Sequence, residues 1–254
     1  MIEYKTPQEI AKIREAGRVV ATILERIKYA IKPGITTKDL EKIAEATLKE
    51  FNARSAFKGY KPNGVPVPFP GLICTSVNEE VVHGIPSDRR LKDGDIVSVD
   101  VGVELDGYFA DGAETFQVGR VNHEIAKLLE TTKRALLAGI LQAQIGKTLV
   151  DIASAIEKIV SEAGFSVVRD LVGHGVGKSL HEDPPVANFV SGARPIPLNE
   201  GMVIAIEPMV NLGNWRIKTL KDGWTVVTKD GKPSAHFEHS VAITNIGPLV
   251  LTRL

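Results

Sequence analysis

Residues 9–51 read EIAKIREAGRVVATILERIKYAIKPGITTKDLEKIAEATLKEF, and residues 124–165 read EIAKLLETTKRALLAGILQAQIGKTLVDIASAIEKIVSEAGF. Both stretches show Glu-Ile-Ala-Lys, a long helical run, a break at a glycine and a restart at Thr-x-x-Asp. A threonine with an acid three residues later is a helix start signal, because both side chains satisfy free backbone N–H groups. Each stretch therefore predicts two successive helices. The breaks are at Gly34 and Gly146, and the restarts run from Thr36 to Asp39 and from Thr148 to Asp151.

The first helix carries two further signals. It opens on Thr6-Pro7-Gln8-Glu9, which is a capping box with proline at the first helical position. Its apolar residues recur with the 3.6-residue period of a helix, so one face is expected to pack against the rest of the protein. These residues are Ile10, Ile13, Gly17, Val20, Leu24, Ile27 and Ile31.

A second pattern repeats downstream of each helix pair. LKDGDIVSVD at residues 91–100 aligns with LNEGMVIAIE at residues 198–207. Each predicts a turn followed by a β-branched strand, and each strand ends on a carboxylate, Asp100 or Glu207.

Two related helix-helix-strand units predict an α+β body with a pseudo-two-fold axis, helices outside and a central antiparallel β-sheet. The halves are about 1–120 and 121–254. His83-Gly-Ile-Pro in the first half also corresponds to His181-Glu-Asp-Pro in the second. No Gly/Ser-rich linker divides the chain, so residues 1–254 are expected to form a single domain with a site where the halves meet.

The composition excludes several classes of protein. The 254 residues include 31 basic and 31 acidic side chains, so no global charge draws the chain to nucleic acid or an anionic membrane. A hydrophobic content of 43% is typical of globular proteins rather than disordered ones. The single cysteine, Cys74, excludes an intramolecular disulfide. Without a long apolar run or a signal core, the chain is expected to be soluble and cytoplasmic.

Four carboxylates stand in strongly apolar contexts, where a charge is unfavourable unless it is paired or bound to a metal. Asp100 lies in IVSVDVGV, and Asp111 follows it across an Asp106-Gly107 turn, which predicts a hairpin with the two acids opposite or diagonal. Glu207 and Glu238 end or occupy later strands, and His174 stands between two glycines. Four carboxylates and one imidazole suit paired divalent ions such as manganese, cobalt, iron or zinc.

Other chemistries fit the sequence less well. A lone buried aspartate or histidine is more often structural than functional, so the metal hypothesis depends on all five residues together. The chain has no phosphate-binding glycine motif and no nucleophile elbow. A thiol nucleophile at Cys74, with His83 nearby, is conceivable but leaves the acids unexplained.

Six strings of the sequence together resemble the type I methionine aminopeptidases, two-metal enzymes of the pita-bread fold. The strings are FKGY at 57–60, CTSVNEEVVHGIP at 74–86, DGDIVSVDVG at 93–102, GHGVGKSLHEDP at 173–184, MVIAIEPM at 202–209 and DGWTVVTKDGKPSAHFEHSVAIT at 222–244. The resemblance covers nearly the whole chain, in the minimal bacterial-like form. It implies a cytoplasmic hydrolase that removes the N-terminal methionine from nascent proteins and peptides, preferring a small second residue.

The resemblance also implies roles for individual residues. Water activated by two metal ions would attack the first peptide bond, with Glu207 carrying the proton. His181 would hydrogen-bond the scissile carbonyl, and His83 would contact the backbone of the second substrate residue. The implied metal ligands are Asp100, Asp111, His174, Glu207 and Glu238.

The resemblance places the methionine side chain in an apolar slot lined by Cys74, Phe69, His83 and Trp224. Core packing is an equally good explanation for Trp224. The loop at residues 61–71 is longer than is usual in the family and holds four prolines, so we expect a stiff extended segment. Its register leaves the assignment of Phe69 open. Leu180 stands where an aromatic residue is common.

Two other functions remain as alternatives. Proline-specific peptidases share the fold and the five ligands but usually carry an additional N-terminal domain and a longer histidine motif. A non-catalytic binding module on the same fold would have lost ligands, whereas all five are present here. For the enzyme, we expect a monomer with transient ribosome contact, no membrane association and no direct nucleic-acid binding. The sequence leaves the native metal ion open.

Overall fold

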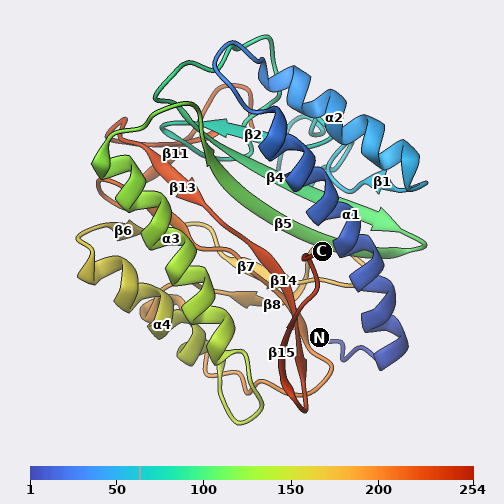
Figure 1. The fold of residues 1–254 in the computed structure, drawn as a ribbon. Coiled ribbons are helices and arrows are strands. Elements are labelled where there is room, and N and C mark those ends of the chain that lie inside the picture. The colour runs from blue at the N-terminus through green and yellow to red at the C-terminus, as the bar shows by residue number, and fades with distance from the viewer. Residues whose placement is uncertain (63) are drawn as a thin grey trace.

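The computed structural model describes residues 1–62 and 64–254, and Figure 1 shows their arrangement. In chain order, the elements are α1 Pro7–Ala30, α2 Thr37–Glu50, β1 Arg54–Ser55, β2 Cys74–Val77, β3 Glu80–Val82, β4 Ile96–Leu105, β5 Tyr108–Gln117, α3 His123–Gln142, α4 Leu149–Glu162, β6 Ser166–Val167, β7 Gly173–Gly175, β8 Glu182–Val186, the 3-10 turn η1 Val190–Gly192, β9 Val203–Ile206, β10 Met209–Asn211, β11 Ile217–Thr219, β12 Val226–Thr228, β13 Ser234–His236, β14 His239–Thr244 and β15 Gly247–Val250.

The predicted helix starts are confirmed in both halves. The N–H of Glu9 donates to Thr6 Oγ1 at 3.3 Å, and the Glu9 carboxylate accepts the N–H of Thr6 at 2.8 Å, which completes the capping box of α1. The second helix of each half begins at its predicted threonine cap. There the Asp39 and Asp151 carboxylates accept the N–H groups of Thr36 and Thr148.

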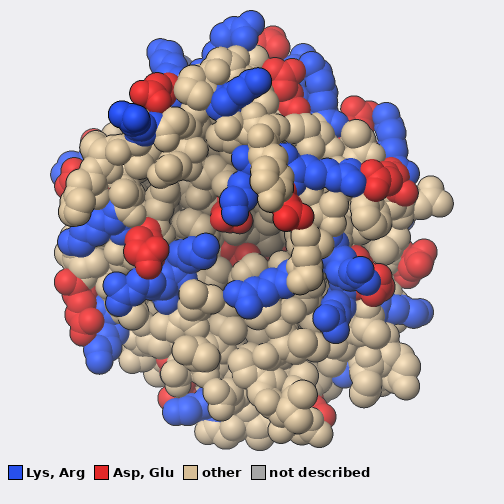
Figure 2. Space-filling view, viewed as in Figure 1, with Lys and Arg blue, Asp and Glu red and all other residues tan. Residues whose placement is uncertain are grey.

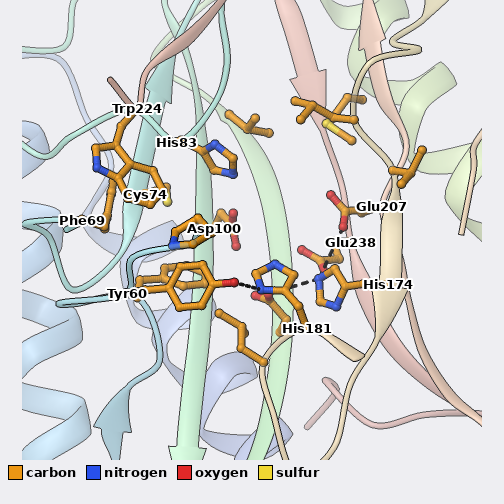
Figure 3. Close-up of a pocket in the computed structure, with 18 residues that line it drawn as sticks. Tyr60, Phe69, Cys74, His83, Asp100, His174, His181, Glu207, Trp224 and Glu238 are labelled. Carbon is orange, nitrogen blue, oxygen red and sulfur yellow. Dashed lines mark hydrogen bonds and ion pairs between the residues drawn. The ribbon is translucent and has the colours of Figure 1, made fainter. Parts of the chain in front are cut away.

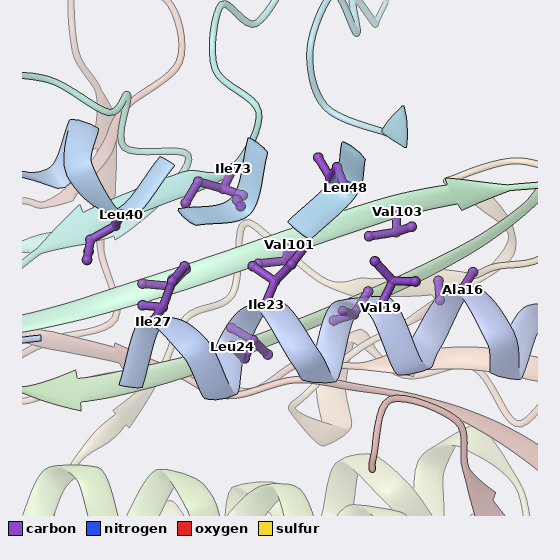
Figure 4. Close-up of a cluster of buried hydrophobic side chains, with 14 of the residues drawn as sticks. Ala16, Val19, Ile23, Leu24, Ile27, Leu40, Leu48, Ile73, Val101 and Val103 are labelled. Carbon is purple, nitrogen blue, oxygen red and sulfur yellow. The ribbon is translucent and has the colours of Figure 1, made fainter. Parts of the chain in front are cut away.

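The apolar stripe of α1 packs on the hairpin β4–β5, as Figure 4 shows. Ile13, Val20 and Ile27 are fully buried there. Gly17 sits where the helix approaches the chain after β15 most closely, since a Cβ at this position would collide with the carbonyl oxygen of Leu251. The stripe therefore includes a glycine because a backbone segment, rather than a side chain, lies against it.

The β4–β5 hairpin is the longest strand pair of the first half. Asp106 and Gly107 form the turn, and both have positive φ, as a tight two-residue hairpin turn requires. Asp100 pairs with Ala113, and Asp111 pairs with Gly102, so the two acids are diagonal neighbours. The hairpin predicted from the sequence is confirmed.

Within the described residues, the strands form four antiparallel sheets. Two of them correspond across the halves: β4 is central to the β1–β4–β2 group, and β9 lies inside the order β15-β14-β9-β7-β8. The chain crosses between sheets at Phe237 and Glu238, because β13 pairs with β10 whereas β14 pairs with β9. Glu238 thus lies between two strands, and Glu207 lies one residue beyond β9, where backbone pairing ends.

The helices cover one face of the strand layer. In Figure 1, α1 and α2 lie over the first half, and α3 and α4 lie over the second. Figure 2 shows this face with basic and acidic side chains interleaved and a hollow near its centre. A cavity of about 290 Å³ lies there between α1 and α3. Within residues 1–62 and 64–254, none of the helices has the length and apolar character needed to cross a membrane.

Candidate active site

A separate cavity of about 270 Å³ holds every residue that the sequence singled out (Figure 3). These residues come from both halves and lie up to 169 positions apart in sequence, from Phe69 to Glu238. The predicted residues that line the cavity are Phe69, Cys74, His83, Asp100, Asp111, His174, His181, Glu207, Trp224 and Glu238.

Three of the predicted ligands form a compact group. Asp111, His174 and Glu238 each offer a ligand atom within 4.8 Å of the others. Glu207 joins them, since its Oε1 lies 3.6 Å from His174 Nε2, and Asp111 Oδ2 lies 3.8 Å from the same nitrogen. Asp100 is the diagonal neighbour of Asp111 on the hairpin. A divalent cation among these atoms would have both carboxylate and imidazole ligands.

Ser240 connects the two halves beside this group. Its Oγ accepts the N–H of Asp111 at 3.0 Å and donates to the carbonyl oxygen of the same residue at 2.8 Å. The N–H of Glu238 also donates to the carbonyl oxygen of Ala113 at 2.9 Å. These bonds join β5 to the start of β14, and they bring Asp111 and Glu238 to one place.

Glycines on both sides of His174 let β7 sit close to its neighbours. A Cβ at Gly173 would collide with the carbonyl oxygen of Ala205, and one at Gly175 with that of Asp183. His174 Nδ1 lies 2.9 Å from the carbonyl oxygen of Gly175, an acceptor, so the proton belongs on Nδ1. Nε2 then presents its lone pair to the carboxylates, which is the arrangement of a metal-binding histidine.

Burial changes the proton affinity of the whole group. It raises the pKa of Asp111 to about 7 and that of Glu207 to about 8. Burial and the neighbouring Asp111 also raise the pKa of Asp100 and of Glu238 well above their usual values. Burial lowers the pKa of His174 to about 3, so its ring is neutral at physiological pH. Four buried acids with a neutral histidine lack a compensating positive charge among the described residues.

Unpaired oxygen atoms indicate what could supply that charge. Among the described residues, Asp100 Oδ1 and Glu238 Oε1 are buried without a hydrogen-bond partner. Buried polar atoms are nearly always satisfied, and unpaired carboxylate oxygens together with a raised carboxyl pKa are what a cation site looks like without its ion. The donor set therefore fits divalent metal ions.

His181 lies at the opening of the ligand group. Its ring centroid is 4.3 Å from that of His174, and its Nδ1 lies 2.8 Å from the hydroxyl of Tyr60, as Figure 3 shows. Burial lowers the pKa of His181, which favours the neutral ring. If Tyr60 donates to Nδ1, the ring proton is on Nε2, and that nitrogen can donate a hydrogen bond to a substrate.

Aromatic and sulfur-containing side chains form the other wall of the cavity. Phe69 packs edge-on against Trp224, with ring centroids 5.1 Å apart. The ring centroids of Trp224 and His83 are 6.0 Å apart. The indole N–H of Trp224 donates to the carbonyl oxygen of Val67 at 2.9 Å, which ties this wall to the proline-rich loop. Trp224 is thus both buried and part of the cavity lining.

The structure settles two further points about this wall. Burial and the nearby carboxylates raise the pKa of Cys74 well above its usual value, which favours the protonated thiol over a thiolate nucleophile. Residues 61, 62 and 64–71 form neither helix nor strand, as the prolines predicted, and Asn63 lies outside the described residues.

Sequence reasoning missed two polar residues of the site. Tyr60 ends the string FKGY, but nothing in its spacing shows that the hydroxyl reaches His181. His236 is fully buried, both its ring nitrogens lack a hydrogen-bond partner, and its Nε2 lies 3.6 Å from Glu207 Oε2. Its position two residues before Glu238 was the available signal, and its Nε2 also lies 3.9 Å from Glu238 Oε2.

Comparison with known proteins identifies the class. Residues 11–245 match metallopeptidase family M24. The solved prolidase from Pyrococcus furiosus shares the fold, with a TM-score of 0.75 and 24% identity over 99% of this chain and 65% of that one. The chain belongs to metallopeptidase family M24, and its duplicated architecture is the pita-bread fold of that family.

Full-length similarity narrows the position within the family. Methionine aminopeptidase 1 of Bacillus subtilis is 52% identical over 100% of both chains, and the methionine aminopeptidase of Escherichia coli is 42% identical over 99% of this chain and 94% of that one. The crystal structure of methionine aminopeptidase from Thermotoga maritima has a TM-score of 0.95 and 42% identity over 100% of both chains. Within family M24, the chain groups with the bacterial methionine aminopeptidases.

Proposed function

We propose that this protein is a metal-dependent aminopeptidase that removes the N-terminal methionine from peptides and nascent proteins. The observation that carries the proposal is a buried group of four carboxylates and one imidazole, which faces an apolar slot. Full-length similarity to methionine aminopeptidases supports the same substrate class. The same cavity, of about 270 Å³, is lined by both the acidic group and the aromatic wall.

The five acidic and imidazole side chains would hold two divalent ions, drawn from cobalt, manganese, iron or zinc. When bound, such ions supply a Lewis acid that polarises a carbonyl and makes water nucleophilic near neutral pH. The free α-amino group of the substrate would bind beside these ligands, which would restrict the reaction to chain ends. The holding residues are Asp100, Asp111, His174, Glu207 and Glu238.

Glu207 and His181 carry out the proton and charge chemistry. Glu207 takes the proton from the attacking water and passes it to the leaving amine, because its carboxylate lies within the ligand group, 3.6 Å from His174 Nε2. His181 donates from Nε2 to the scissile carbonyl oxygen and stabilises the developing oxyanion, while Tyr60 holds Nδ1. His83 contacts the backbone of the second substrate residue from the opposite wall.

The slot formed by Phe69, Cys74 and Trp224 receives the methionine side chain. A flexible thioether packs well against aromatic rings and sulfur, whereas a charged side chain would be desolvated there without a partner. Leu171, Val172 and Met209 also line the cavity, and we propose that they leave room only for a small second residue.

We further propose that residues 1–254 act as one catalytic domain made of two halves and work as a cytoplasmic monomer. Transient contact with the ribosome would give access to nascent chains, and the β11–β12 region beside Trp224 offers basic residues for it: Arg216, Lys218, Lys221 and Lys229. The mass in solution tests the monomer. Co-sedimentation with ribosomes tests the contact. Protein that stays in the supernatant when the ribosomes are pelleted would contradict it.

Peptide release tests the proposed activity. Purified protein supplied with manganese or cobalt is incubated with Met-Ala-Ser, Met-Leu-Ser, acetyl-Met-Ala-Ser and Ala-Pro-Ala, and free amino acids are measured. The proposal predicts methionine release from Met-Ala-Ser, much slower release from Met-Leu-Ser and none from the other two. Cleavage of Ala-Pro-Ala instead would assign a proline-specific peptidase. No cleavage of any peptide by folded protein would favour a binding module.

A further inference from the structure

The turn that carries His181 is held by a charged residue far away in sequence. Lys5 Nζ lies 2.5 Å from Glu182 Oε2, and both side chains are removed from water, with 2% and 12% of their surface exposed. Removal of one partner from a desolvated ion pair is strongly unfavourable, because the remaining charge has lost its hydration. Glu182 is the residue directly after His181.

Glu182 in turn holds the backbone of the turn. Its Oε1 accepts the N–H of Lys178 at 2.7 Å and the N–H of Ser179 at 3.0 Å. The carboxylate therefore closes the segment that precedes His181, with one oxygen on the backbone and the other on Lys5. A charged acceptor makes each of these bonds stronger than a neutral one would.

Lys5 is itself held by the backbone. The backbone N–H of Lys5 donates to the carbonyl oxygen of Gly201 at 2.7 Å. The N–H of Gly201 donates in turn to the carbonyl oxygen of Ile243 in β14. The aliphatic stem of Lys5 also lies against Gly177, where a Cβ would collide with Lys5 Cε. These contacts fix the position of the Lys5 ammonium group relative to β14, the strand that begins directly after Glu238.

A second ion pair connects the same segments. Lys178 Nζ lies 2.8 Å from Glu9 Oε1 at the start of α1, on a more exposed part of the turn. The lowered pKa of Glu9, about 2, follows from its hydrogen bonds to Lys178 and Thr6. The N-terminal segment thus contacts both ends of the turn, while Tyr60 holds the ring of His181 from the cavity side.

We propose that Lys5 is a positioning residue for His181 and acts through the Glu182 carboxylate. The inference rests on the proposed function, in which His181 donates to the scissile carbonyl oxygen. That role requires Nε2 to stay within a few tenths of an ångström of its place, and a misplacement of about 1 Å can lower a rate about 100-fold. Loss of Lys5 would leave Glu182 buried without its partner and would let the turn move.

Steady-state kinetics of Lys5→Met test the proposal, since methionine keeps the length and packing of the stem. Turnover of Met-Ala-Ser is expected to fall roughly 10- to 100-fold in kcat with KM within about twofold of the wild type. Glu182→Gln keeps an oxygen for the two backbone N–H groups and should give a smaller loss of the same type. Arg26→Met is the control, because it removes an inter-helix ion pair with Glu50 that is remote from the cavity.

A double-mutant cycle with His181→Ala separates positioning from a general structural effect. If Lys5 acts through His181, Lys5→Met should lower kcat no further in the His181→Ala background. An equal loss in both backgrounds would overturn the proposal, as would a normal kcat for the single variant. Melting curves establish that each variant is folded, and Glu182→Gln takes the place of Lys5→Met in the cycle if the latter unfolds.

A spectroscopic measurement does not depend on turnover. In ¹⁵N-histidine spectra, the ring resonances of His181 should shift in Lys5→Met and stay unchanged in Arg26→Met. Unchanged His181 resonances in both variants would contradict the proposal. A wild type that releases no methionine counts against the proposed function, whereas an active wild type with an unimpaired Lys5→Met counts against the role of Lys5.

Discussion

At the scale of single residues, His174 shows how backbone geometry prepares a metal ligand. The carbonyl oxygen of Gly175 accepts a hydrogen bond from its Nδ1–H, and the small neighbours on β7 let the strand lie close enough for Nε2 to approach Glu207 and Asp111. Among the predicted ligands, His174 is the one imidazole beside four carboxylates. Its removal should therefore affect ion binding more than packing.

We predict that His174→Ala abolishes methionine release while the protein stays folded. The substitution removes one ligand but few apolar contacts, so the circular dichroism spectrum should match that of the wild type. Calorimetric titration should show manganese affinity lowered by at least the 10- to 100-fold that loss of an outer-shell partner brings. Activity close to that of the wild type would refute the assignment of His174.

We predict that His181→Ala lowers kcat by about 100- to 1,000-fold, because one oxyanion donor is lost. Tyr60→Phe should give a smaller loss of the same kind, since the ring of His181 keeps its place but loses its Nδ1 partner. The kinetics of both variants on Met-Ala-Ser provide the test. An effect confined to KM would mean that His181 binds substrate without stabilising the transition state.

The sequence predicts functional residues best where an unusual residue type occupies an apolar context. Asp100 and Glu207 were identifiable for that reason, because a carboxylate in such a run needs a partner. Asp111 was identifiable from its place across the hairpin turn from Asp100. Tyr60 and His236 lacked this signal. Tyrosine is common beside pockets, and the unpaired nitrogens of His236 are visible only once the fold buries them.

At the scale of secondary-structure elements, local patterns were the most informative. Helix caps depend on residues three positions apart, and the β4–β5 hairpin depends on a two-residue turn, so both are encoded locally. The break at Glu238 is different. It arises because β13 and β14 pair with different strands, and no short stretch of sequence contains that information.

We predict that Gly17→Ala destabilises the protein, although alanine favours an isolated helix. The added Cβ would meet the backbone carbonyl of Leu251, which cannot rotate away, so α1 or the C-terminal segment must move. We expect a loss of about 1–3 kcal/mol in the free energy of unfolding, measured by urea denaturation. Arg18→Ala, an exposed neighbour on the same helix, should change it by less than about 0.5 kcal/mol. A stabilised Gly17→Ala would show that the helix packs less closely than described.

At the scale of the whole molecule, the two halves supply different parts of one site. The hairpin β4–β5 brings Asp100 and Asp111, and the second half brings the histidine and the two glutamates. The duplication indicated that the halves meet, because both strand patterns end on a carboxylate. The distances among these side chains depend on tertiary contacts such as those of Ser240, which sequence patterns do not encode.

Proton binding by the site should make the metal-free protein less stable as the pH rises. Folding raises the pKa of Asp111 to about 7 and that of Glu207 to about 8, from ordinary values of 3.8 and 4.5. Between about pH 7.5 and 8.5, where unfolded histidines are already neutral, the folded protein therefore holds carboxyl protons that the unfolded chain has lost. Stability falls wherever the native state binds more protons, so it decreases across this window. Below this window the buried histidines oppose the trend, because folding lowers the pKa of His174 to about 3 and that of His236 to about 4 from an ordinary 6.5, so the unfolded rings bind protons near pH 6.5 that the folded rings do not.

Thermal melting of metal-free protein in a chelator checks this prediction. The midpoint should fall from about pH 7.5 to 8.5, and added manganese should raise it by more at pH 8.5 than at pH 7.5. Glu207→Gln should weaken the decrease, because its amide does not titrate. A midpoint that rises over this range would contradict the account of the buried carboxylates.

The metal-dependent aminopeptidase activity that we propose is tested most directly by measuring methionine release as a function of added metal. Metal-stripped protein is titrated with manganese or cobalt, and free methionine from Met-Ala-Ser is measured at each step. We expect no release without metal, a saturable rise as ions are added, and no rise for His174→Ala. Undiminished release in the presence of excess chelator would contradict the proposal, as would tight metal binding by folded wild type with no release at any concentration.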